Sequence, residues 1–123
     1  MEKFSRGDIV LVPFPFIASG SVQQKLRPAL IISDPLAQRR FSDVILMAIT
    51  SKVPPSLEVT EVLIDPSSPD FARTGLAKAS VIRIEMLMTL PQAILIRKIG
   101  SLSPVYLRQV ERAISKYLGL TPE

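Results

Sequence analysis

The stretch DVILMAIT, residues 43–50, begins and ends on polar side chains and is apolar at every position between them. An unbroken apolar run of this length, rich in β-branched residues, indicates a strand buried on both faces. The run is also far shorter than the roughly 20 apolar residues that a membrane-spanning helix needs. The stretch therefore predicts a buried strand, and no span of the chain predicts a membrane helix.

Shorter apolar runs precede this stretch. Residues 9–12 predict a buried strand that follows a turn, and residues 29–33 predict a second strand. Pro13 and Pro15 are expected to end the first strand, because proline has no N–H to donate to a central ladder. The polar residues between these two strands, 16–26, predict a mobile loop.

Three further strands are expected after the central stretch, at residues 58–64, 78–85 and 94–101. Residues 65–75 contain two prolines and a glycine and predict a long connection. Residues 86–93 fit either a strand or a short helical turn near Pro91.

The C-terminal segment predicts an amphipathic helix. Ser103 is a good N-cap, Pro104 occupies the first helical position, and Gly119 is placed to end the helix. The expected apolar face consists of Leu107, Val110, Ile114, Tyr117 and Leu118. Five or six short strands and one terminal helix indicate a mainly β fold, a small SH3-like barrel or strongly bent antiparallel sheet, in one domain over residues 1–123.

The composition excludes several kinds of site. The chain has no Cys and no His, which removes disulfides, thiolate metal sites and the commonest general base. No cluster of carboxylates has metal-ligand spacing, and no glycine-rich phosphate loop is present, so we expect neither a metal nor a cofactor. Catalysis would then depend on Arg, Lys, Asp, Glu, Ser, Thr or Tyr.

The net charge and the apolar content of the chain indicate which kinds of partner it binds. Lys and Arg number 15 against 11 Asp and Glu, and the net charge of +4 favours an acidic partner such as nucleic acid. Hydrophobic residues make up 47% of the chain, a surplus that favours a subunit interface. The N-terminus does not resemble a signal peptide, so a cytoplasmic protein is expected.

Arg27 is the first candidate site residue. Pro28 restricts it to an extended conformation at the start of a strand, and a guanidinium forks its donors towards phosphate oxygens. A structural arginine is the alternative. Thr50, Ser51 and Lys52 place two hydroxyls and an ammonium at a strand end, where they could grip a phosphate or simply form a turn.

Arg83 and Glu85 are the second candidate pair. Residues two apart in a strand point to the same face, so the guanidinium and the carboxylate would stand side by side. They could form a structural ion pair. They could equally supply a base next to a phosphate clamp, which RNA cleavage by its own 2′-hydroxyl requires.

The order of motifs along the chain resembles the MazF/PemK family of toxins of type II toxin–antitoxin systems. The resemblance covers nearly the whole chain, and its motifs are Gly7-Asp8-Ile9-Val10, residues 27–33 (RPALIIS), Ala48-Ile49-Thr50-Ser51, Thr74-Gly75-Leu76, residues 79–83 (ASVIR), and residues 99–103 (IGSLS) before the helix.

The resemblance implies an SH3-like barrel that forms a homodimer, cuts single-stranded RNA without a metal, and is blocked by a cognate antitoxin. Arg27 and Thr50 match the catalytic arginine and threonine of the family. Arg83 and Glu85 match an arginine and an aspartate of the Kid branch, with Glu in place of Asp. The expected RNA-binding residues are Gln24, Lys25, Ser51 and Lys52.

The implied reaction is attack of the 2′-hydroxyl on the adjacent phosphorus, giving a 2′,3′-cyclic phosphate and a 5′-hydroxyl. Glu85 is the expected base, and Arg27 is expected to stabilise the phosphorane. Two alternatives stay open. One is a toxin that poisons DNA gyrase, like CcdB, although this chain lacks the C-terminal tryptophan on which CcdB depends. The other is a non-catalytic RNA-binding relative.

Overall fold

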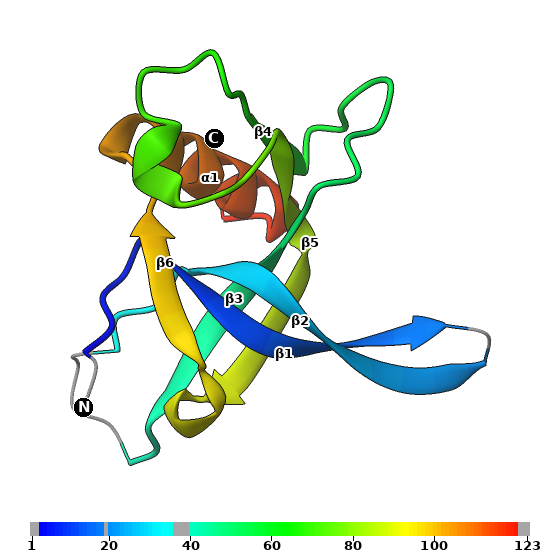
Figure 1. The fold of residues 1–123 in the computed structure, drawn as a ribbon, viewed down its shortest axis with the longest axis vertical. Helices are drawn as coiled ribbons and strands as arrows, with labels where there is room; N and C mark the ends of the chain where they lie inside the picture. The colour runs from blue at the N-terminus through cyan, green and yellow to red at the C-terminus, as the bar shows by residue number, and fades with distance from the viewer. Residues whose placement is uncertain (1–2, 19, 36–39, 121–123) are drawn as a thin grey trace.

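The computed structural model describes residues 3–18, 20–35 and 40–120, except the side chains of residues 15–18 and 22–24. In these residues six strands form one antiparallel sheet in the order β4-β5-β3-β2-β1-β6 (Figure 1). The strands are β1 Asp8–Ala18, β2 Ser21–Ile31, β3 Asp43–Thr50, β4 Glu61–Ile64, β5 Ser80–Pro91 and β6 Arg97–Ser101. The helices are the short 3₁₀ turns η1 Ala72–Thr74 and η2 Gln92–Ile94, and the C-terminal helix α1 Pro104–Tyr117. The mainly β fold with a strongly bent sheet and a C-terminal helix is confirmed.

Strand β3 lies inside the sheet, between β2 and β5, with the bounds that its sequence predicts. Its side chains alternate between two cores, one on each face of the sheet. Val44, Leu46 and Ala48 pack in the first core with Phe14 of β1. The second core, which contains Met47 and Ile49 of β3, is covered by α1.

The first strand does not end at Pro13. β1 continues through Pro13 and Pro15, and residues 16–26, expected as a loop, lie mostly within a two-stranded ribbon that projects from the sheet (Figure 1). The Leu11 carbonyl accepts the N–H of Ile96, on the side of β6. Since alternate residues of a strand direct their backbone polar groups to the same side, both proline nitrogens face that side too. β6 pairs with β1 only as far as Leu11, so neither proline interrupts a ladder.

Strand β5 is longer than expected and irregular. It reaches Pro91, and the helical turn expected there is η2, which follows directly. Between the pairs Met47↔Leu87 and Ile49↔Ile82, β3 has the single residue Ala48 whereas β5 has residues 83–86. This shift of register bends β5 and breaks the alternation of its side chains at residues 83–86, which include the candidate site residues Arg83 and Glu85.

Strands β4 and β6 are shorter than expected. Residues 58–60 form a turn before β4, closed by a hydrogen bond from the Glu61 N–H to the Glu58 carbonyl. Residues 94–96 belong to η2 and its exit rather than to β6. Both strands sit at the edges of the sheet.

Helix α1 begins after Ser103 with Pro104 in its first turn, as predicted, but the buried Ser103 hydroxyl makes no capping hydrogen bond within the described residues. Its Val110 is fully buried in the second core, and Leu107 and Ile114 pack against that core. Tyr117 and Leu118, expected on the same face, are 48% and 50% exposed, so the buried face ends at Ile114. Within the described part of the chain, no helix is long and apolar enough to cross a membrane.

Candidate active site

A cavity of about 400 Å³ lies where strands β2, β3, β4 and β5 meet. We call it the Arg27 cavity, and it is lined by Phe14, Arg27, Ala48, Ile49, Thr50, Lys52, Pro54, Glu61, Arg83 and Met86. Arg27, Thr50 and Arg83 are three of the four residues expected to be catalytic, and they come from three different strands. The fold therefore brings together residues that are far apart in the sequence.

Arg27 lies where β2 and β3 separate. Pro28 pairs with Leu11, whose backbone polar groups face β6, so the Pro28 nitrogen faces the opposite side, towards β3. Pairing of β2 with β3 starts only at Ala29. Because Pro28 cannot donate to β3, the two strands diverge there, and the half-buried Arg27 side chain lines the opening between them.

Thr50 is the last residue of β3. Its Oγ1 accepts a hydrogen bond from the backbone N–H of Lys52 at 3.1 Å, which holds the turn that places Lys52 in the cavity wall. A hydroxyl that accepts one hydrogen bond still has its proton to donate. Thr50 can therefore donate to an oxygen bound in the cavity.

Arg27 also lines a second cavity, of about 290 Å³, which we call the Lys78 cavity. Its walls include Lys25 and Ser51, two of the expected RNA-binding residues, and Lys78, which the sequence did not single out. The fourth expected RNA-binding side chain, Gln24, lies outside the described residues. Arg27 thus stands between two adjacent cavities that both contain cationic side chains.

The shifted register separates Arg83 from Glu85. Arg83 lines the Arg27 cavity, whereas Glu85 is not among its lining residues, and Glu85 Oε1 accepts a hydrogen bond from Thr60 Oγ1 at 2.9 Å. The carboxylate in the cavity wall is Glu61, which stands opposite Arg83 in the β4–β5 pairing. Glu61 Oε1 accepts the Glu58 N–H at 2.7 Å, so the turn before β4 holds this side chain.

The sequence did not point to Glu61. Its only local signal is a carboxylate within an irregular apolar strand, and its proximity to Arg83 depends on the pairing of β4 with β5. That register depends on which faces of the two strands are buried, and the residues next to Glu61 in sequence do not show this by themselves.

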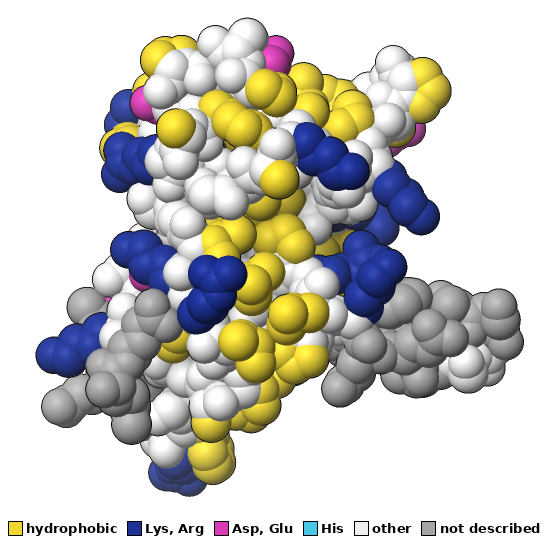
Figure 2. Space-filling view, in the orientation of Figure 1, with side chains coloured by type: hydrophobic (Ala, Val, Ile, Leu, Met, Phe, Trp, Pro, Cys, Tyr) yellow, Lys and Arg dark blue, Asp and Glu magenta, His cyan; other side chains and the backbone are white. Residues whose placement is uncertain are grey.

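The Arg27 cavity has an excess of positive charge. Its walls hold three cationic side chains, on Arg27, Lys52 and Arg83, against the single carboxylate of Glu61. Lys and Arg side chains also flank a band of apolar side chains on the face shown in Figure 2, where few Asp and Glu side chains are visible. A site of this kind suits a phosphodiester, whose charge the cations neutralise.

The same lining does not suit a divalent metal, because hard cations require several oxygen ligands and the cavity offers one carboxylate. Within the described residues, no three Asp, Glu, His or Cys side chains form a group that could hold a metal ion.

Comparisons with known proteins cover nearly the whole chain. Residues 5–118 match the family model of the PemK-like, MazF-like toxin of type II toxin–antitoxin systems. The Endoribonuclease MazF of Staphylococcus saprophyticus is 33% identical over 115 residues, which cover 94% of this chain and 91% of that protein.

Two solved structures are similar over nearly their whole length. The Mycobacterium tuberculosis toxin MazF-mt6 is 25% identical, with a TM-score of 0.70 and coverage of 94% of this chain and 99% of that one. A mycobacterial endoribonuclease in complex with its cognate antitoxin is 20% identical, with a TM-score of 0.71 and coverage of 98% and 100%, and shares the fold.

Proposed function

The chain belongs to the PemK-like, MazF-like toxin family of type II toxin–antitoxin systems, and from that premise we propose that it is an endoribonuclease that cuts single-stranded RNA at the Arg27 cavity without a metal. The observation that carries the proposal is the convergence of Arg27, Thr50 and Arg83 in one positively charged cavity. A phosphate bound there is surrounded by two guanidiniums and a hydroxyl.

In the proposed reaction the 2′-hydroxyl of the RNA attacks the adjacent phosphorus. The 2′-hydroxyl loses its proton to the base, the O2′–P bond forms and the P–O5′ bond breaks, and the leaving O5′ takes a proton from water, which gives a 2′,3′-cyclic phosphate and a 5′-hydroxyl. Arg27 and Arg83 stabilise the extra negative charge of the phosphorane, and the Thr50 hydroxyl donates to a phosphoryl oxygen. Because a guanidinium is a poor acid, charge stabilisation comes before proton transfer in the role of Arg27.

A carboxylate is the proposed base for the 2′-hydroxyl. The sequence favours Glu85, but Glu61 is the carboxylate in the wall of the cavity, whereas Glu85 is engaged by Thr60. One oxygen of Glu61 accepts the Glu58 N–H, and the other oxygen can accept the proton. We therefore place Glu61 ahead of Glu85.

The RNA strand is proposed to run from the Arg27 cavity into the Lys78 cavity, past Arg27. Lys52 lines the first cavity, and Lys25 and Ser51 line the second, so both contain groups that bind phosphate. A cognate antitoxin, such as the one bound to the mycobacterial relative, is the proposed inhibitor.

The active form is proposed to be a homodimer that acts in the cytoplasm. Exposed apolar side chains, among them Phe41, Ile96 and Val105, provide surface for the subunit contact.

The test is cleavage of a long unstructured RNA by the purified protein in EDTA, with the ends of the products mapped. We expect cleavage with 2′,3′-cyclic phosphate and 5′-hydroxyl ends, and no cleavage of DNA of the same sequence. Cleavage that EDTA abolishes would contradict the metal-free mechanism. Binding of several RNAs without cleavage of any would indicate a non-catalytic relative.

A further inference from the structure

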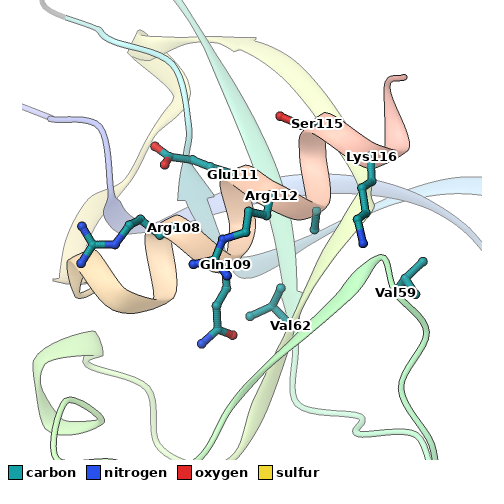
Figure 3. A pocket seen from close by; sticks show the side chains of 9 residues that line it. Val59, Val62, Arg108, Gln109, Glu111, Arg112, Ser115 and Lys116 are labelled. Atoms are coloured by element: carbon teal, nitrogen blue, oxygen red, sulfur yellow. The ribbon is translucent and has the colours of Figure 1, made fainter. Parts of the chain in front are cut away.

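A second charged hollow lies away from Arg27, between α1 and the turn that precedes β4. It has a volume of about 760 Å³, larger than the Arg27 cavity, and we call it the helix groove. Its walls are formed mainly by Val59, Val62, Arg108, Gln109, Arg112 and Lys116 (Figure 3). None of these residues lines the Arg27 cavity.

The charge of the helix groove is positive. Arg112 and Lys116 project from the helix towards Val62 and Val59 (Figure 3). Glu111 points away from the two valines, and its carboxylate is paired with Arg6 at 2.6 Å. Within the described part of the chain, neither Arg112 nor Lys116 forms an ion pair. The groove therefore presents cations beside an apolar wall, and its one carboxylate is already neutralised.

Strand β4 separates the helix groove from the Arg27 cavity. Glu61 lines the cavity and its neighbour Val62 lines the groove, because adjacent residues of a strand point to opposite faces. A ligand in the groove contacts the back of the strand whose front carries Glu61. It can bind without occupying the space around Arg27.

The residues that line the helix groove favour one kind of ligand over others. An RNA strand matches the cations with its phosphates but carries no aliphatic side chain to pack against Val59 and Val62. A second copy related by a two-fold axis through the groove would bring the same cations together. Val59, which is 80% exposed, offers an apolar contact directly beside these cations. An acidic peptide that also carries apolar side chains complements both features.

We propose that the helix groove binds an acidic, partly apolar segment of the cognate antitoxin, on the face of β4 opposite the Arg27 cavity. This inference rests on the proposed function, since it assumes a toxin that an antitoxin neutralises. The antitoxin is then anchored at a site that RNA does not use.

The test measures the Kd of the purified cognate antitoxin for the full chain, in the absence of RNA. We expect Arg112→Glu combined with Lys116→Glu to weaken binding by about 10-fold or more, because attraction becomes repulsion at two positions. Arg97→Glu, on an exposed residue of β6 outside the groove, is the matched control and should change Kd by less than about 2-fold. Val59→Asp, at an exposed turn position, should weaken binding without any change in the helix.

RNA cleavage is measured on the same variants, and the proposal expects it to stay at the wild-type rate. An unchanged Kd for both groove variants would overturn the proposal. So would a loss of RNA cleavage or of the dimer in these variants, which would assign the groove to RNA or to a second copy. Failure of the wild type to cut RNA would instead refute the proposed activity, and the comparison of Kd values would still decide the occupant of the groove.

Discussion

The two positively charged hollows on either side of β4 differ in how their cations are held. In the Arg27 cavity the two arginines, Arg27 and Arg83, are half-buried and come from strands. In the helix groove the cations are exposed and come from consecutive turns of one helix. A half-buried guanidinium on a strand is fixed in position and interacts through a lower dielectric, which favours transition-state stabilisation. Exposed cations on a helix favour binding of a flexible acidic partner.

The largest expected effect is in the Arg27 cavity. Arg27→Ala should lower kcat for RNA cleavage by about 10²–10³-fold, because it removes a preorganised donor to the phosphorane. Arg112→Ala removes the same charge from the helix groove and should leave kcat unchanged. Equal losses in the two variants would show that Arg27 acts only through its contribution to the net charge of the protein. Circular dichroism and the melting temperature check that both variants fold.

The second prediction separates the two candidate bases. Glu61→Gln keeps the shape of the side chain but removes the proton acceptor, and should lower kcat by about 10²-fold. Glu85→Gln keeps an oxygen that can accept the Thr60 hydroxyl and should have little effect. Single-turnover cleavage rates measure both. A larger loss of kcat in Glu85→Gln than in Glu61→Gln would identify Glu85 as the base, as the sequence favours.

The third prediction concerns the support of the Lys78 cavity. A Cβ at Gly100 would lie 2.3 Å from the Thr74 backbone, so Gly100→Ala should lower the free energy of unfolding by about 1–3 kcal/mol. The displaced segment continues into Leu76 and Lys78, which line that cavity.

Gly119→Ala is the control for this prediction, because a Cβ at Gly119 meets no atom within 4 Å, although its φ of +72° disfavours alanine. Gly119→Ala should lower the free energy of unfolding by about 1 kcal/mol. Urea unfolding followed by circular dichroism gives both values. An unchanged free energy of unfolding for Gly100→Ala would show that the Thr74 backbone can move away from residue 100 without loss of stability.

The smallest expected effect is at Thr50. Thr50→Val removes the hydroxyl but keeps the β-branched shape that a strand prefers, and should lower kcat by about 10-fold through one lost hydrogen bond to a phosphoryl oxygen. Thr50→Ser keeps the hydroxyl and should restore most of the rate. A Thr50→Ser variant as slow as Thr50→Val would assign Thr50 a packing role.

Part of the site was readable from the sequence. Arg27 and Thr50 lie in motifs of consecutive residues, and the extended conformation of Arg27 follows from Pro28 alone. Glu85 was favoured by the rule that residues two apart share a face. That rule holds for a regular strand, and β5 is irregular at residues 83–86. The side chain that replaces Glu85 in the cavity wall, Glu61, belongs to another strand.

The sequence by itself determined the elements whose signals are local. The apolar run within Asp43–Thr50 specifies a buried strand, and Pro104 at the first helical position specifies the start of the helix, because hydrophobic patterning and the fixed φ of proline act within one segment. Only the tertiary structure decided which edge of β1 the two prolines face, which carboxylate stands opposite Arg83, and how Val62 and Arg112 form one groove. The physical reason is that strand register depends on long-range pairing, and a slip of one residue reverses every side chain between two faces.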